Sequence, residues 1–357
     1  MKVIRYIILV LNITAILALW ACCFSTMVHP MYYPYVGVVG LAFPAILAVN
    51  LLFLIPWLFL RKRLLLLPLV GMGVASGFIL DYCPMNRRVS APEGADVVKV
   101  VTWNSHGFGW SPNSTNHDSL SAEFTRYVKD TDADIVCLQE AAGENQWFAK
   151  RFIKEMKAEG YVTSYVGGRA LVTRYELVDT MRVKFDTRGC NGAAVFTLFD
   201  GKDTLVVVNI HFESDQFSPD EMEDYAQVIR NPDEVSFRAL GVTFVERLGS
   251  AAKVRAAQVD SVVAYLDRLD GRRIIVCGDF NDTPISYAYK QFDGRLDNVF
   301  RKAGRGIGLS YNKRKFPVRI DHIFASDDWK PYGAFVDKRV TVSDHFPVVV
   351  WLEKREK

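Results

Sequence analysis

The N-terminal part of this chain has almost no charged residues. No Asp, Glu, Lys or Arg occurs between Tyr6 and Leu60, whereas a membrane helix needs only about 20 apolar residues. A turn rich in proline and tyrosine interrupts this stretch, and the basic run Arg61–Arg63 ends it. We therefore expect two membrane-spanning helices, at about residues 6–28 and 35–60.

Other absences narrow the class of protein further. The 6 cysteines show no metal-like spacing such as CxxC, and they do not support a disulfide scaffold. The net charge of +3 is too slight to indicate a nucleic-acid or anionic-membrane partner by itself. No internal repeat or low-complexity tract occurs, and nothing in the sequence indicates a protein partner.

A third apolar run, at about residues 64–80, predicts one more membrane helix near the lower length limit for a span. We expect residues 1–81 to form a transmembrane region, 82–96 a linker and 97–357 a folded domain. The alternative for residues 1–28 is a cleaved signal peptide, but the apolar region is too long for one and a second span follows directly.

Basic residues set the expected orientation. Lys2 and Arg5 precede the first span, and Arg61–Arg63 lie between the second and third. Because cytoplasmic loops are enriched in Lys and Arg, we expect a multi-pass protein with a cytoplasmic N-terminus. The large C-terminal region would then be extracytoplasmic.

From residue 97 onward, short strand patterns alternate with helical ones. Runs such as Val206–Val208, Ile274–Val276 and Val348–Val350 are apolar at successive positions, which is typical of strands buried on both faces. This pattern predicts an α/β fold with covered sheets. The acidic insert 214–250 is expected to cover or border a site. The predicted strands are 97–103, 134–138, 170–173, 193–199, 204–210, 273–277, 319–325 and 347–352, and the predicted helices are 117–130, 145–159 and 253–269.

Acid and amide side chains follow one of these strands. Gly278 permits a tight turn after the strand, so Asp279 and Asn281 can face the same side. A carboxylate there can deprotonate water, and an amide can hold a phosphate oxygen without adding negative charge. The alternative is a polar turn capped by these two residues.

Asp344 and His345 precede the last strand, and their side chains are expected to diverge. His345 then needs another carboxylate to fix its tautomer. Asp321 is the natural candidate because it lies in an apolar strand, where an unpaired carboxylate is costly. Its neighbour His322 is expected to be structural.

Three further strand ends carry polar residues: Glu140, Asn104 and His211. A single carboxylate at a strand end suits Mg²⁺, which prefers oxygen ligands. Taken singly, each residue has a simpler interpretation, as an exposed loop residue or a structural histidine. Their joint presence with the two preceding groups indicates a metal-assisted phosphoryl hydrolase.

This ordered set resembles the endonuclease/exonuclease/phosphatase superfamily, which includes deoxyribonuclease I-like nucleases, inositol polyphosphate 5-phosphatases and neutral sphingomyelinases. The resemblance spans about Val97 to Leu352 and rests on Gly-Asp-Phe-Asn at 278–281 and Ser-Asp-His at 343–345. It implies a four-layer α/β sandwich, in which two packed mixed sheets are flanked by helices. It also implies a divalent metal, usually Mg²⁺ with Mn²⁺ as a possible substitute, and in-line attack of water on a phosphate ester.

The resemblance also implies roles for individual residues. The metal would be bound by Glu140, Asn104 and Asp344. The residues implied to be catalytic are Asp279 for activating water, Asn281 for orienting the phosphate, His345 with Asp321 for contacting it, and His211 for the leaving oxygen. Arg174 and Asn191 fall where the family often places substrate-binding residues.

The substrate class stays open in the sequence. The basic segment 301–319 favours a nucleic acid and hence a nuclease-like phosphodiesterase. The membrane region favours a phospholipid headgroup and a sphingomyelinase-like enzyme, and a phosphomonoesterase is a further alternative. A non-catalytic, membrane-bound binding module is the alternative of another class, although none of the expected site residues is missing.

Overall fold

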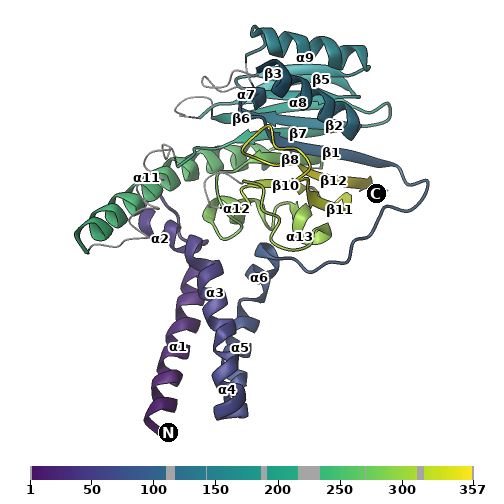
Figure 1. Ribbon diagram of the computed structural model, residues 1–357. Coiled ribbons are helices and arrows are strands. Elements are labelled where there is room, and N and C mark those ends of the chain that lie inside the picture. Colours follow the sequence, from purple (N-terminus) through teal and green to yellow (C-terminus); the bar gives the residue numbers. More distant parts are fainter. Residues whose placement is uncertain are drawn as a thin grey trace. The chain divides into compact units, whose positions relative to one another are not determined.

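The computed structural model describes residues 2–109, 117–141, 143–185, 191–215, 234–269, 271–311 and 317–355 (Figure 1). The chain divides into two compact units. The helical unit comprises Met1–Cys83, Asp215–Ala256 and Thr283–Lys290. The sheet unit comprises Pro84–Ser214, Ala257–Asp282 and Gln291–Lys357. Two segments from beyond residue 97 therefore belong with the N-terminal helices.

Two helical stretches in the helical unit are long and apolar enough to cross a membrane, Lys2–Ser25 and Pro34–Leu60. Both coincide with predicted spans. The third predicted span is broken, because residues 62–74 and 76–82 form helices that bend by 64°. The elements are α1 (Lys2–Ser25), α2 (Pro34–Val39), η1 (Gly40–Ala42), α3 (Phe43–Leu52), α4 (Leu54–Leu60), η2 (Lys62–Leu65), α5 (Leu66–Val74) and α6 (Ser76–Tyr82).

Buried polar contacts join these helices. The indole nitrogen of Trp57 donates to Oδ1 of Asn12 at 2.9 Å, and Asn50 Nδ2 donates to the carbonyl of Ala15, also at 2.9 Å. Asn12 of α1 contacts Trp57, whereas the later residue Ala15 contacts the earlier residue Asn50. Helix α1 therefore runs antiparallel to α3 and α4. Interhelical hydrogen bonds of this kind hold apolar helices together where water is excluded.

The sheet unit is built on two mixed sheets of 6 strands each, in the orders β11-β12-β1-β2-β4-β3 and β5-β6-β7-β8-β10-β9. The pairs β1–β2 and β7–β8 are parallel, and both lie inside their sheets. The strands are β1 (Val97–Asn104), β2 (Ile135–Gln139), β3 (Val162–Val166), β4 (Arg169–Thr173), β5 (Glu176–Val183), β6 (Gly192–Phe199), β7 (Thr204–His211), β8 (Arg273–Asp279), β9 (Asp297–Asn298), β10 (Asp321–Ala325), β11 (Trp329–Val336) and β12 (Val348–Lys354).

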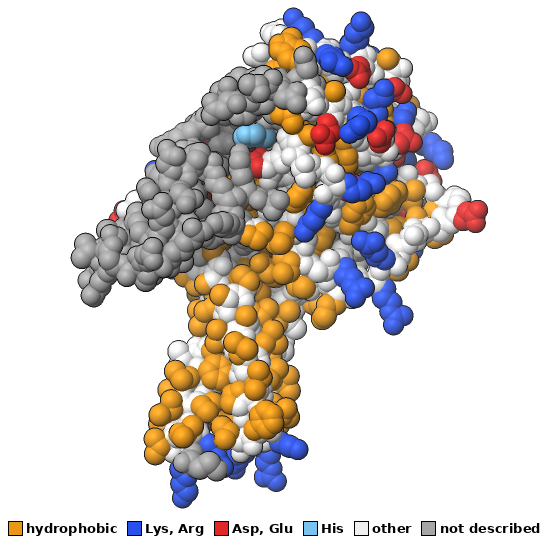
Figure 2. Space-filling model, in the orientation of Figure 1, with side chains coloured by type: hydrophobic (Ala, Val, Ile, Leu, Met, Phe, Trp, Pro, Cys, Tyr) orange, Lys and Arg blue, Asp and Glu red, His pale blue; other side chains and the backbone are white. Residues whose placement is uncertain are grey.

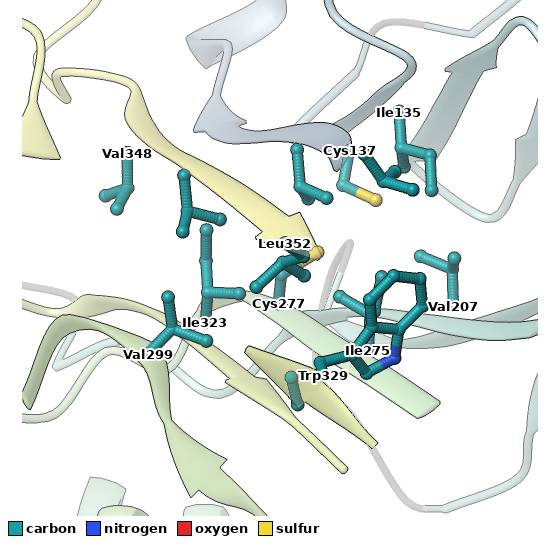
Figure 3. Close-up of a cluster of buried hydrophobic side chains, with 14 of the residues drawn as sticks. Ile135, Cys137, Val207, Ile275, Cys277, Val299, Ile323, Trp329, Val348 and Leu352 are labelled. Carbon is teal, nitrogen blue, oxygen red and sulfur yellow. The ribbon is translucent and has the colours of Figure 1, made fainter. Parts of the chain in front are cut away.

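The two sheets pack face to face through aliphatic side chains (Figure 3). Ile135 and Cys137 of one sheet meet Val207, Ile275 and Cys277 of the other, and all five are buried. Burial of each large aliphatic side chain contributes about 1.5–3 kcal/mol. The apolar runs in the sequence are explained by this contact, since the opposite faces of the same strands are also covered.

Helices cover the outer faces and complete the predicted four-layer α/β sandwich. On the first sheet, Phe124 of α8 and Phe152 of α9 pack with Trp103 and Val136. On the second, the buried Val259 and the residues around it belong to α11. The helices of this part of the chain are α7 (His106–Gly109), α8 (His117–Thr131), α9 (Trp147–Ala158), α11 (Glu234–Leu266), α12 (Tyr287–Phe292) and α13 (Val299–Ala303).

Candidate active site

The polar residues identified in the sequence come together at one edge of the sandwich. Asn104 ends β1, and its register partner on the parallel strand β2 is Gln139, which Glu140 follows. In the second sheet, Asp279 is the register partner of both His211 and Asp321. Because the carboxyl ends of parallel strands share an edge, residues distant in sequence converge here.

The turn after β8 depends on a glycine. Gly278 has φ +145°, and a Cβ there would lie 2.0 Å from the carbonyl oxygen of Ile210 on β7. In the turn itself, the backbone N–H of Asn281 donates to Oδ1 of Asp279 at 2.8 Å. The side-chain amide of Asn281 donates to the carbonyl of Phe212 at 2.9 Å. These bonds fix both Asp279 and Asn281.

An amide lies between two carboxylates. Nδ2 of Asn104 donates to Glu140 at 3.0 Å and to Asp279 at 2.9 Å. Burial acts to raise the pKa of Glu140, but contacts with His106, His211 and Asn104 outweigh it and lower the pKa to about 2. Glu140 is therefore ionised at neutral pH.

His345 has the carboxylate partner expected from the sequence pattern. Its Nδ1 lies 2.8 Å from Oδ2 of Asp321, and its Nε2 lies 3.7 Å from Oδ2 of Asp279. Burial acts to lower the pKa of His345, but the charges of Asp321 and Asp279 outweigh burial and raise it to about 10. The imidazole is thus positively charged at neutral pH. Ser310 Oγ accepts the backbone N–H of Asp321 and fixes the start of β10.

The pKa of Asp279 is also raised, but for a different reason. Burial is the largest influence and raises its pKa to about 6, although the nearby His345 and His211 act to lower it. His211 is also buried, and its Nε2 lies 3.5 Å from Glu140 and 3.8 Å from Asp279. Within the described ranges, neither ring nitrogen of His211 makes a hydrogen bond. An imidazole held this way can receive or donate a proton at a bound ligand.

One residue of the site was missed in the sequence. Nδ1 of His106 lies 3.4 Å from Glu140 and 3.7 Å from Asp344, so one imidazole faces both predicted metal ligands. His106 has φ +43°, in a backbone region that few non-glycine residues adopt. Its position two residues after Asn104 was the available signal. Ser343, whose hydroxyl donates to the carbonyl of Asn104 at 2.7 Å, joins the Ser-Asp-His segment to β1.

The two predicted substrate-binding residues have different locations. Arg174 forms an ion pair with Asp132 and lies over the Tyr161 ring. It follows Thr173, which is the register partner of Ile135 at the start of β2. That places it at the opposite end of β2 from Glu140, so the structure does not bring Arg174 to the site.

Asn191 precedes Gly192, the register partner of His211, and therefore lies at the site's edge of the sheet. It is buried, and its amide donates to Glu213 at 2.7 Å. Part of the basic segment 301–319, residues 312–316, lies outside the described residues, as does 216–233 of the predicted insert.

The donor set fits a hard divalent cation. The three side chains Asp279, Asp321 and His345 offer ligand atoms within 4.8 Å of one another. However, Asp321 is already hydrogen-bonded to His345, so that group is better suited to proton transfer. Glu140 is ionised and more accessible, with 36% of its side chain exposed. Metal binding by Asn104 requires its amide to rotate, so that the oxygen replaces Nδ2 beside Glu140.

Comparison with known proteins agrees with this geometry. Residues 101–345 match the endonuclease/exonuclease/phosphatase family, and the chain belongs to that family. Residues 5–82 match a domain family of unknown function. The uncharacterized protein YbhP of Escherichia coli strain K12 is 27% identical over 274 residues, which cover 70% of this chain and 94% of YbhP.

Solved structures share the fold at low identity. The catalytic domain of human Nocturnin with bound sulfate superposes with a TM-score of 0.54 at 16% identity, covering 72% of this chain and 94% of that one. The structure of ANGEL2, a 2′,3′-cyclic phosphatase, superposes with a TM-score of 0.53 at 14% identity. The match covers 76% of this chain and 100% of the ANGEL2 chain. Humanized D. rerio TDP2 superposes with a TM-score of 0.51 at 14% identity. The match covers 72% of this chain and 99% of the TDP2 chain.

Proposed function

We propose that this chain is a membrane-anchored, Mg²⁺-dependent phosphodiesterase that hydrolyses its substrate by attack of water. The charged His345–Asp321 pair beside the buried Asp279 carries the proposal. The raised pKa of Asp279 suits a base, whereas the raised pKa of His345 keeps its imidazole protonated, so the two groups can fill different roles in an acid–base site. The family supports phosphoester hydrolysis in general.

Each group has a distinct task. Asp279 accepts a proton from the attacking water, because its raised pKa makes it a better base than an ordinary carboxylate. The cationic His345 binds a phosphate oxygen and stabilises the charge that develops there. Asn281 orients the phosphate, and His211 assists the leaving oxygen.

Glu140 would be the principal metal ligand, with Asn104 and Asp344 beside it and Mn²⁺ as a possible substitute for Mg²⁺. The metal would supply positive charge to the phosphate oxygens. His106 lies between two of these ligands and would orient their carboxylates. Carboxylate and amide oxygens in this number suit Mg²⁺, which keeps several waters.

The test uses the full chain purified in detergent. With Mg²⁺ present, it should hydrolyse the soluble diester bis(p-nitrophenyl) phosphate, and Asp279→Asn should lower kcat by about 10²–10⁴-fold. Asp200→Asn is the matched control, because Asp200 follows β6 in the hairpin turn at the other end of β7. Equal activity in the parent and Asp279→Asn would contradict the proposal.

Two other outcomes separate the alternatives. Hydrolysis of p-nitrophenyl phosphate without hydrolysis of the diester would identify a phosphomonoesterase. Metal binding without hydrolysis of either compound would favour a non-catalytic binding module.

We also propose that α1, the stretch Pro34–Leu60 and the bent pair of helices at residues 62–82 each cross the membrane, which puts the N-terminus in the cytoplasm and the sheet unit outside it. The first two of these are antiparallel, so Lys2 and Arg5 lie at the same end as Arg61–Arg63. In Figure 2, the Lys and Arg side chains of these helices lie at one end of an otherwise hydrophobic surface. A C-terminal alkaline phosphatase fusion, active only outside the cytoplasm, tests the orientation.

A further inference from the structure

An eight-residue segment of the helical unit follows the Asp279 turn directly along the chain. Thr283–Lys290 belongs with the N-terminal helices by its contacts. Ile285 is buried in a cluster with Leu19 of α1 and Phe43 of α3. The ring of Tyr287 lies 4.7 Å from that of His29.

Contact with this segment depends on the absence of a side chain at Gly40. A Cβ at Gly40 would lie 2.0 Å from the carbonyl oxygen of Ile285, which is far inside van der Waals contact. Gly73 on α5 has no atom within 4 Å of its Cβ position, so glycine is not required sterically at every such place in these helices. At position 40, therefore, glycine is required by the close approach of the Thr283–Lys290 segment.

These contacts occur at the end of the helices opposite the basic residues. His29 lies between α1 and α2, the connection that follows the C-terminus of α1. Trp57 on α4 contacts Asn12 on α1, whereas Phe43 on α3 packs near Leu19, so the antiparallel helices carry Lys2 and Arg61–Arg63 away from this connection. Thr283–Lys290 therefore packs at the end of the helices that carries the connection between α1 and α2.

The same end carries exposed aromatic and apolar side chains. Tyr32, Tyr33 and Tyr35 are all more than half exposed to solvent. Aromatic residues with a polar tip are enriched where a membrane meets water. A Cβ at Gly249 of α11 would lie 3.4 Å from side-chain atoms of Pro34 and Tyr35, and the α11 residues Val242 and Val245 are also exposed. This end of the helical unit therefore has the composition of a membrane–water interface.

Covalent connection limits the distance of the catalytic turn from this interface. Asp279 precedes Ile285 by about six residues, which span at most roughly 22 Å when fully extended. The headgroup layer on each side of a bilayer adds about 5–8 Å to the hydrocarbon core. Under the membrane orientation proposed above, so short a tether would keep Asp279 within reach of phosphates at the membrane surface.

Resting on the proposed function, we infer that the site hydrolyses the phosphodiester of a phospholipid headgroup at the membrane surface, and that Thr283–Lys290 holds it there. The water oxygen bonds to phosphorus as one ester P–O bond breaks. One water proton passes to Asp279, and the leaving oxygen takes a proton from His211 to become an alcohol. The products are a phosphomonoester and that alcohol. Nucleic acid is the competing substrate class.

The experiment uses the full chain in vesicles of phosphatidylethanolamine and phosphatidylglycerol. Phosphomonoester release from the lipid is measured beside hydrolysis of bis(p-nitrophenyl) phosphate and nicking of plasmid DNA, all with Mg²⁺. We expect kcat/KM for the lipid to exceed kcat/KM for the soluble diester and for plasmid DNA by about tenfold or more, because the tether raises the local lipid concentration. Asp279→Asn should abolish lipid and soluble hydrolysis together.

The tether itself is tested at Gly40. Gly40→Ala should lower the ratio of lipid to soluble-diester hydrolysis by about tenfold, as the loss of a local concentration effect would. Gly73→Ala, a glycine in the same group of helices with open space around it, should leave the ratio unchanged. If Gly40→Ala does not fold, Ile285→Ala removes the packed side chain instead and should change the ratio in the same direction.

The possible failures can be distinguished. Soluble-diester hydrolysis without lipid hydrolysis overturns the inference and leaves the proposed function standing. Plasmid nicking with the highest kcat/KM overturns it in favour of nucleic acid. Hydrolysis of none of the three substrates overturns the proposed function and this inference with it.

Discussion

Nδ1 of His345 and Oδ2 of Asp321 are 2.8 Å apart, and both side chains are buried. A carboxylate in this position fixes the tautomer of the imidazole and stabilises its charged form. The pair joins the segment before β12 in one sheet to the first residue of β10 in the other. His345 therefore presents Nε2 toward Asp279 in a fixed orientation.

Replacing Asp321 should impair catalysis through His345. In Asp321→Asn the imidazole loses its principal counter-charge, so its pKa should fall from about 10 toward the ordinary value. We expect kcat for the soluble diester to fall by about 10²–10³-fold, the usual cost of losing a group that stabilises charge in the transition state. NMR titration of the His345 ring should report the pKa change, and an unchanged urea unfolding midpoint should show that the variant is still folded, because an unfolded chain would also give the ordinary pKa. Unchanged titration together with unchanged kcat would refute the role.

The rate should depend on pH through two groups. Asp279 must be ionised to accept a proton, so kcat/KM should rise with pH up to about 6. His345 must be protonated, so kcat/KM should fall as pH passes about 10. A pH profile of kcat/KM checks both limbs, and in Asp321→Asn the alkaline limb should move to lower pH. An acidic limb near the ordinary aspartate pKa of about 3.9 would argue against Asp279 as the base.

Removing the carboxylate of Glu140 should weaken metal binding. Glu140→Gln keeps the shape of the side chain but loses the charge, and we expect Mn²⁺ affinity to fall by at least about tenfold. Electron paramagnetic resonance of free Mn²⁺ measures the affinity directly. Glu144→Gln is the control, because Glu144 is exposed in the segment that follows β2. Equal affinity in the two variants would move the metal site away from Glu140.

That most of the candidate residues lie together could be predicted from the sequence, because they lie at the ends of buried strands. A strand such as Ile274–Cys277 is recognised by its consecutive apolar residues, and Asp279 lies two residues after it. Strand ends share an edge, so order along the chain was enough to group Asn104, Glu140 and Asp279. The position of His106 could not be predicted in this way, because His106 lies two residues after a strand end and has a left-handed backbone conformation.

The missed strands have a common physical cause. β5 is an edge strand with mostly exposed side chains, and β3 is also at an edge, so neither has the apolar run that marks the central strands. β11 is another edge strand and is interrupted by Pro331 and Gly333. In the helical unit, the break at Ala75 could not be predicted from hydropathy, which is continuous across it. Membership of Thr283–Lys290 in that unit depends on packing that no local pattern encodes.

Stability should also depend on pH, through the buried His322. Burial lowers the pKa of His322 to about 3, and the charge of Arg319 acts in the same direction. The unfolded chain has an ordinary histidine pKa of about 6.5, so it binds a proton that the folded chain does not between about pH 6.5 and 3. The free energy of unfolding should therefore fall as pH decreases through this window, by about 4 kcal/mol in total.

His322→Gln tests this dependence, because Gln cannot take up a proton in this range and can still donate to the carbonyl of Asp282, which lies 3.0 Å from Nε2. Urea unfolding of the full chain in detergent, repeated between pH 7 and pH 4, gives the pH slope for the parent and the variant. The variant should be less stable at pH 7 and have a shallower slope. Equal slopes would show that His322 becomes protonated within the folded protein, contrary to its packing beside Phe280 at 5.2 Å between ring centres.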